Sequence, residues 1–290
     1  MSQNRKPTKI RMITDTQTEL MTTDTHAGPK RLIATLQSKG ALGKSYFMAL
    51  LMEYYQYAGI PFKAIDCDVV HQSLKRRYNT GFFDSALDQD NFGQLLATLP
   101  DSPAVLWDFR ANFTPDFLRY ARHYQLPSIL ERRGFRATLP IFTSDDEDAR
   151  RSAADLAEYF SESADYLLID NPKLFSSSEF RRTGLYKWLA GRDTPLITIP
   201  EMHSVTKNYW EELEDKQGTH LSMTKVIAAK DCLDVAYYEL SGIKDMMFRQ
   251  FEDYAKFLMP DTGRIKEKVT RVADSVLKSA VFKSAFASKS

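Results

Sequence analysis

The feature that most constrains the fold is a glycine-containing loop at residues 39–45, which reads Lys-Gly-Ala-Leu-Gly-Lys-Ser. An apolar stretch, residues 32–36, precedes the loop, and a helix-like run, residues 46–58, follows it. Glycines at these places allow backbone N–H groups to turn inward around a polyphosphate, while the helix directs its positive dipole end at the same anion. The segment predicts a phosphate-binding loop in which Lys44 contacts the β- and γ-phosphates and Ser45 ligates Mg²⁺. A turn that binds nothing is the alternative.

Composition fits one large α/β unit and excludes several other classes of protein. The chain has 290 residues, 43% of them hydrophobic, which suits one domain or one domain with a helical extension. Lysine and arginine number 39 against 38 acidic residues, so net charge gives no global argument for nucleic-acid binding. The two cysteines, Cys67 and Cys232, indicate no disulfide framework. With no signal-peptide region or membrane-length apolar run in the sequence, we expect a cytoplasmic location.

Short apolar runs alternate with helical patterns from Arg31 onward, which is typical of a parallel sheet covered by helices. The expected strands are residues 32–36, 62–65, 104–107, 138–142, 166–169 and 196–199. After Pro200 only helices are expected, at about 203–215, 221–229, 231–258 and 263–286. We therefore expect a flexible polar tail at 1–29, an α/β P-loop core at 30–205, and a helical extension of the same domain at 206–290.

Three carboxylates follow the predicted strands. Asp66 and Asp68 end the second strand and Asp108 ends the third, so they face the crevice that also holds the loop. Asp108 has the form of a Walker B acid, which holds Mg²⁺ through water. Asp66 and Asp68 lie on one side of the chain, so one is expected near the metal and the other where a carboxylate positions the attacking water. The alternatives are that Asp108 is a solvated strand end and that Asp66 or Asp68 caps the following segment.

Lys39 sets this loop apart from the common form. The common motif has glycine at position 38, where this chain has Ser38 followed by a second lysine. The loop resembles the deviant Walker A motif, Lys-Gly-Gly-x-Gly-Lys-[Ser/Thr], of the ParA/MinD ATPases, and the strand-end acids resemble that family's Asp-x-Asp and Walker B residues. The resemblance covers about residues 30–205. Residues 66–74, Asp-Cys-Asp-Val-Val-His-Gln-Ser-Leu, are most similar to the plasmid branch, the TraL/StbB-like conjugation and stability ATPases.

The resemblance implies a P-loop NTPase fold and a nucleotide-sandwich dimer, in which Lys39 reaches the phosphates of the partner. Hydrolysis then depends on dimerisation, because charge that develops in the transition state is stabilised in trans. The implied catalytic residues are Lys39, Lys44 and Asp68, and the implied metal residues are Ser45, Asp66 and Asp108. The implied nucleotide-binding residues are Gly40, Ala41, Leu42, Gly43, Lys44, Ser45, Tyr46, Asn171, Pro200 and Glu201. Asn171 matches an adenine-contacting asparagine, and Pro200-Glu201 matches the segment that covers the base.

Two departures from the family pattern affect what the resemblance implies. Ala41 replaces the usual second glycine, which its methyl group allows if the residue has a negative φ. Phe109-Arg110 follows Asp108 in place of the common Asp-x-Pro, so the segment after the Walker B acid is expected to respond differently to the γ-phosphate.

These features predict an ATP-hydrolysing dimeric switch, with ATP and Mg²⁺ as ligands, that serves plasmid or chromosome partition, mobilisation or conjugation. The expected partners are a second copy of the chain, a protein of a DNA partition or transfer system, and DNA bound without sequence preference. One alternative is a P-loop kinase that transfers the γ-phosphate to a small acceptor, with Asp68 as base. Another is a non-catalytic interaction protein that the nucleotide only stabilises.

Two basic segments are further candidates for partner surfaces. Residues 264–286 combine Lys and Arg with apolar residues at helical spacing. Such a helix packs on its own domain or a partner subunit, lies on an anionic membrane, or touches nucleic-acid phosphates; packing is favoured over peripheral membrane contact. Arg181, Arg182 and Lys187 form a smaller group, for which a solvated helix face is the simplest interpretation. The five histidines show no metal-ligand spacing, so no structural zinc site is predicted.

Overall fold

The sheet at the centre of the protein is entirely parallel. The computed structural model describes residues 29–68, 71–78, 80–83, 89–172, 174 and 176–261. Seven strands lie in the order β3-β2-β4-β1-β5-β6-β7. They are β1 (Lys30–Thr35), β2 (Phe62–Cys67), β3 (Gly81–Phe82), β4 (Ala104–Phe109), β5 (Phe135–Phe142), β6 (Ala164–Asp170) and β7 (Leu196–Thr198). The expected α/β class with a P-loop NTPase fold is confirmed by this sheet and by the strand–loop–helix unit at its centre.

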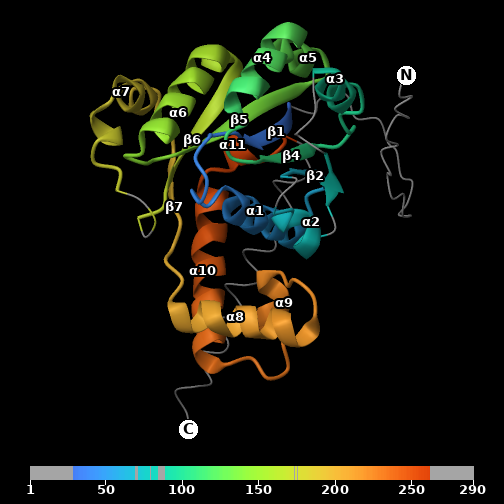
Figure 1. Ribbon diagram of the computed structural model, residues 1–290, viewed down its shortest axis with the longest axis vertical. Helices are drawn as coiled ribbons and strands as arrows, with labels where there is room; N and C mark the ends of the chain where they lie inside the picture. The colour runs from blue at the N-terminus through green and yellow to red at the C-terminus, as the bar shows by residue number, and fades with distance from the viewer. Residues whose placement is uncertain are drawn as a thin grey trace, which may run out of the picture.

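Helices cover both faces of the sheet, as a buried parallel sheet requires. They are α1 (Lys44–Ala58), α2 (Ser73–Tyr78), α3 (Gln89–Ala97), α4 (Thr114–Tyr124), α5 (Leu126–Arg132), α6 (Glu147–Phe160), α7 (Gly184–Ala190), α8 (Ser204–Gln217), α9 (Met223–Ile227), α10 (Asp234–Asp253) and α11 (Ala255–Leu258). In Figure 1, α4, α5 and α6 lie above the sheet and α1 and α2 below it, with α8 and α9 farther down beside the amino-terminal half of α10. The phosphate loop joins β1 to α1 within this arrangement.

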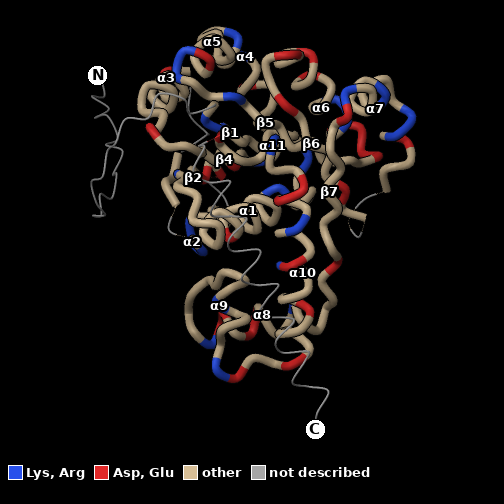
Figure 2. Tube along the Cα trace, turned by 180° about the vertical axis from the view of Figure 1, so that it is seen from behind, with Lys and Arg blue, Asp and Glu red and all other residues tan. Residues whose placement is uncertain are grey.

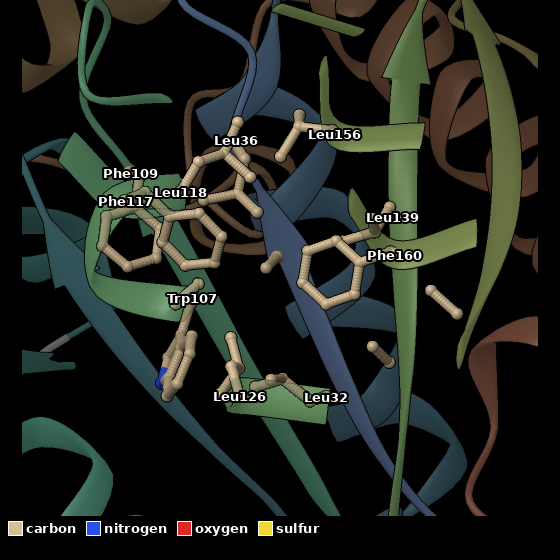
Figure 3. Packing of buried hydrophobic residues seen from close by; sticks show 14 of the residues in the cluster. Leu32, Leu36, Trp107, Phe109, Phe117, Leu118, Leu126, Leu139, Leu156 and Phe160 are labelled. Carbon is tan, nitrogen blue, oxygen red and sulfur yellow. The ribbon is translucent and has the colours of Figure 1, made fainter. Parts of the chain in front are cut away.

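Strand β4 shows how alternate residues serve the two faces. Trp107 and Phe109 join the aromatic core under α3 to α6, where Figure 3 shows them with Phe117 and Phe160. Leu106 belongs to the second core, on the α1 side of the sheet. Because side chains alternate along a strand, Asp108 points to the α1 side as well. The strand therefore presents its only carboxylate to the helix that follows the phosphate loop.

The carboxyl-terminal helices share the core on the α1 side. Phe251 of α10 packs edge-on against Phe47 of α1, with ring centroids 5.8 Å apart. Helix α11 is held to the sheet by Arg31, whose guanidinium donates to the carbonyl oxygens of Lys256 and Met259. The described part of the expected extension thus packs directly on the sheet unit.

The sequence placed six of the seven strands, and it missed β3. Strand β3 has only two residues, opposite Ile65 and Asp66, which is too short to show a period. The helix expected over 231–258 is divided at Tyr254, whose φ of −108° and ψ of 26° are not helical, into α10 and α11. All but Pro29 of the tail expected at 1–29, and the whole helix expected at 263–286, lie outside the described residues. In the described part of the chain, no helix combines the length and apolar character needed to span a membrane.

Candidate phosphate-binding site

Gly43 has a backbone conformation and a close neighbour that favour glycine at this position of the loop. It stands at the start of α1 with φ 94° and ψ 14°, in the left-handed region that side chains with a Cβ avoid. A Cβ added there would also lie 2.8 Å from Nδ2 of Asn171. The loop therefore turns sharply into α1 and accepts the Asn171 side chain against its backbone, where the Asn171 amide donates to the carbonyl oxygen of Leu42 at 3.4 Å.

Ala41 corrects the expectation from the sequence. Its φ is 58°, so the negative φ under which a methyl group is harmless is not what the loop adopts. The left-handed conformation costs a non-glycine residue about 1–2 kcal/mol. Ala41 therefore carries backbone strain that glycine would not.

Lys44 folds back along the loop and is almost fully buried. Its Nζ donates to the carbonyl oxygens of Gln37 at 2.7 Å and Lys39 at 2.9 Å. Burial lowers the pKa of Lys44 to about 8, although the carboxylates of Asp108 and Asp68 act in the opposite direction. An anion bound at the loop would raise the pKa of Lys44 again, because it would favour the charged form.

Lys39 is turned toward its own chain. Its Nζ lies 2.9 Å from Oδ2 of Asp146, and this contact raises the pKa of Lys39 and lowers that of Asp146. Oδ1 of the same carboxylate caps α6 by accepting from the Ala149 N–H at 3.0 Å. A contact from Lys39 to a partner therefore requires this ion pair to open, and the trans role stays a prediction.

Asp108 lies beside the first hydroxyl of α1. Strand pairing sets Thr35 opposite Asp108, and the Thr35 hydroxyl donates to Oδ1 of Asp108 at 2.5 Å. Burial raises the pKa of Asp108 to about 6, against the opposing effect of hydrogen bonds from Ser45 and Thr35. A hydroxyl oxygen and a carboxylate in contact, at the mouth of a phosphate loop, are the kind of donors that Mg²⁺ takes.

Asp66 is opposite Asp108 in the neighbouring strand, but its carboxylate oxygens accept hydrogen bonds from backbone N–H groups. Oδ1 accepts from the Asp68 N–H at 2.9 Å, and Oδ2 accepts from the Leu74 and Lys75 N–H groups at 3.0 Å. Burial raises the pKa of this carboxyl, while the three backbone hydrogen bonds oppose the rise. The contacts are those of the capping alternative, and a role for Asp66 at the metal stays a prediction.

Asp68 is half-buried and faces the same region. Its Oδ1 accepts from the His71 N–H at 3.1 Å, and its charge raises the pKa of Lys44. The structure thus brings Asp68 into electrostatic reach of the loop lysine, as a water-positioning acid requires. A catalytic role for Asp68 stays a prediction.

A cavity of about 470 Å³ extends from the loop toward the carboxyl-terminal helices. Gly43, Ser45 and Tyr46 line one end beside Asn171 and Pro200, which brings the predicted nucleoside-binding residues to one place. Glu201 follows on the exposed connection to α8. The Tyr46 hydroxyl is buried without a hydrogen-bond partner.

Helix α8 forms a wall of the cavity that sequence reasoning missed. Glu214 accepts from Nε and Nη2 of Arg77 at 3.1 and 3.3 Å and from Nε1 of Trp210 at 3.0 Å. Trp210 and Glu214, one helical turn apart, both line the cavity. The spacing of Trp210 and Glu214 was visible in the sequence, but no sequence pattern predicts that α8 contacts α2.

The smaller group of basic residues does not line this cavity, and the candidate segment 264–286 lies outside the described residues. Figure 2 shows basic residues gathered around α7, where Arg181 is paired with Asp170 at 3.0 Å and Arg182 and Lys187 are exposed. Among the residues that the structure describes, no group of three His, Cys, Asp or Glu could hold a metal ion without other ligands.

Comparison with known proteins gives distant structural similarity only. No protein-family model and no curated protein matches the sequence. Among solved structures, MinD from Aquifex aeolicus is 14% identical, with 77% of this chain and 97% of that chain covered at a TM-score of 0.41. FlhF in complex with GMPPNP and Mg²⁺ is also 14% identical, with 62% and 68% covered at 0.37. Because similarity at this level identifies no family, the fold assignment rests on the strand order and loop of this chain.

Proposed function

We propose that the protein binds Mg²⁺-ATP and hydrolyses it as a dimeric switch of the ParA/MinD type. The observation that carries this proposal is the contact of Asp108 with Ser45, beside a buried Lys44, at the glycine turn that opens α1. Burial lowers the pKa of Lys44 and raises the pKa of Asp108, so both groups are held in an environment that disfavours their charged forms. A loop with only a structural role would gain nothing from this cost. Both groups are explained by a ligand that carries phosphate and a divalent cation.

The residues fit Mg²⁺ and triphosphate as follows. Gly40 and Gly43 leave the loop backbone open to phosphate oxygens, and Lys44 neutralises the β- and γ-phosphates. Ser45 and Asp108 hold Mg²⁺, Asp108 through water. The cation, when bound, neutralises charge on the bridging and terminal phosphate oxygens. Asp68 orients the attacking water and accepts its proton.

The ion pair between Lys39 and Asp146 gives the dimer a specific requirement. Lys39 must leave Asp146 before its ammonium group can reach the phosphates bound by a second copy. Exposed ion pairs contribute about 0–1 kcal/mol, so a triphosphate on the partner competes easily for the lysine. This supports a switch in which nucleotide and dimerisation act together.

The nucleoside is assigned to the end of the cavity that Tyr46, Asn171 and Pro200 line. We assign ATP because Asn171 matches the adenine-contacting position of the resembled family. The cellular role that fits the resemblance is DNA partition, mobilisation or conjugation, with a partner protein of such a system. ATPase assays with DNA and with anionic vesicles test this role, because stimulation by DNA alone supports it.

The deciding experiment measures ATP hydrolysis against protein concentration for the wild type and for Lys39→Ala and Lys44→Ala. We expect the specific rate to rise with protein concentration in the wild type. Lys39→Ala should lose hydrolysis and ATP-dependent dimerisation but keep nucleotide binding, whereas Lys44→Ala should lose binding. A rate independent of concentration, with phosphate transferred to an added acceptor, would favour a kinase. Hydrolysis unchanged in Lys39→Ala would exclude the trans role.

A further inference from the structure

Arg110 lies beside the amino-terminal half of the phosphate loop. It is the first residue after β4, two residues beyond Asp108. The Asn112 N–H donates to the carbonyl oxygen of Ser38 at 2.7 Å. A Cβ added to Gly40 would lie 3.7 Å from the Cβ of Ala111. The segment that carries Arg110 is therefore fastened to the amino-terminal half of the phosphate loop.

The guanidinium of Arg110 rests on a rigid aromatic platform. Its Cζ lies 5.7 Å from the centre of the Phe113 ring. Phe113 is buried and stacks on Phe109, with ring centroids 5.2 Å apart and 12° between the ring planes. Both rings belong to the aromatic core under α4. A cation held this way keeps its position without a carboxylate partner.

One hydrogen-bond donor of the Arg110 guanidinium, its Nε–H, is buried and unused. Within the described residues, no carboxylate forms an ion pair with its guanidinium; Lys39, by contrast, is held by Asp146. Leaving a buried donor unsatisfied costs about 1–3 kcal/mol, and more for a charged group. A donor that is positively charged, held in place and unsatisfied is a binding group for an anion.

We propose that Arg110 binds the γ-phosphoryl group in cis and stabilises the charge that develops on it during hydrolysis. In this step water attacks the γ-phosphorus while the bond to the β–γ bridging oxygen breaks. ADP and inorganic phosphate are the products, and the proton of the water passes to Asp68 and then to solvent. Arg110 stays protonated throughout and donates to γ-phosphate oxygens. The proposal rests on the proposed function, and it assigns a role to a residue at which the chain departs from the resembled family.

The expected size of the effect follows from the chemistry. An arginine that contacts the transferred phosphoryl group raises kcat by about 10³–10⁵ in GTPases. Here Lys44 and Mg²⁺ also stabilise the negative charge on the phosphoryl group, so the effect should lie below the top of that range. We expect Arg110→Gln to lower kcat at least about 100-fold. The affinity for Mg²⁺-ADP, which has no γ-phosphate, should change by less than about threefold.

Arg110→Lys and Arg110→Ala refine the test. Lysine keeps the charge but loses the planar guanidinium, so we expect only partial activity. Addition of guanidinium ion at millimolar concentration should restore part of the kcat of Arg110→Ala. Arg119→Gln is the matched control, because Arg119 also lies over an aromatic ring, that of Tyr120 at 4.9 Å, but sits exposed on α4.

The experiment measures kcat at saturating Mg²⁺-ATP, Mg²⁺-ADP affinity, the thermal midpoint and ATP-dependent dimerisation for these variants. Loss of kcat with ADP affinity, thermal midpoint and dimerisation retained supports the proposal. Unchanged kcat in Arg110→Gln overturns it, as does a fall in kcat that only follows lost dimerisation or lost stability. Wild-type protein that binds no Mg²⁺-ATP would refute the proposed function and this proposal together. If the wild type hydrolyses ATP and Arg110→Gln has the same kcat, the role of Arg110 is refuted while the proposed function stands.

Discussion

The turn at Gly43 gives a prediction whose magnitude can be worked from the structure. Gly43→Ala meets two obstacles: a φ of 94° and a contact of 2.8 Å between the new Cβ and Nδ2 of Asn171. The left-handed backbone costs alanine about 1–2 kcal/mol. Crowding at a packed position adds about 1–3 kcal/mol, at the lower end here because an amide end can shift. We expect Gly43→Ala to lose about 2–4 kcal/mol of unfolding free energy in total.

Gly59→Ala separates the two costs. Gly59 ends α1 with φ 66°, and a Cβ there would meet nothing within 4 Å. It should therefore show only the backbone cost, about 1–2 kcal/mol. The double variant Gly43→Ala with Asn171→Ala removes the close contact and should bring Gly43→Ala toward the value of Gly59→Ala, after correction for Asn171→Ala alone.

Chemical denaturation without nucleotide measures these differences, with thermal unfolding as a second readout. In a chain of this size each kcal/mol shifts the thermal midpoint by about 2–4 °C. If Gly43→Ala is no more destabilising than Gly59→Ala, the close approach of Asn171 to the loop is not a feature of the protein in solution. The placement of Asn171 at the nucleoside end of the loop would then lose its support.

Three further outcomes are expected. Ala41→Gly should lower the free energy of unfolding by less than about 0.5 kcal/mol, because relief of the left-handed strain offsets the extra entropy of glycine in the unfolded state. Ala154→Gly, on the exposed face of α6, should lower it by about 1 kcal/mol, and the denaturation midpoints of the two variants compare these costs. Lys44 has a folded pKa of about 8, below its unfolded value of 10.5, so the unfolded state binds more protons between these values and stability without nucleotide should rise with pH across that window. Lys44→Met should remove that rise in pH-dependent melting curves, and Mg²⁺-ATP affinity of the wild type should fall above pH 8 as Lys44 loses its proton. Asp146→Asn keeps a side chain that caps α6 but frees Lys39, so ATP-dependent dimerisation measured by light scattering should strengthen about two- to fivefold; weaker dimerisation would contradict the proposed competition.

The fold followed from local signals that agreed with one another. The buried strands are apolar, each is bounded by turn residues, and Gly59 ends α1 in the left-handed conformation that glycine commonly adopts after a helix. What escaped prediction depends on pairings between distant segments. Strand β3 exists because Gly81 and Phe82 find β2, and the division at Tyr254 allows α11 to reach Arg31.

Asp66 shows why the site was harder to predict than the fold. Its place at the end of β2, opposite Asp108, followed from the strand pattern and the parallel order. Whether its oxygens face a cation or backbone N–H groups depends on where the chain returns eight and nine residues later, at Leu74 and Lys75. Those two N–H groups open α2, and Arg77 near its other end is fastened to Glu214 of α8. The carboxylate beside the proposed metal site thus fixes the helix that joins this site to α8, and its role could be read only from the tertiary structure.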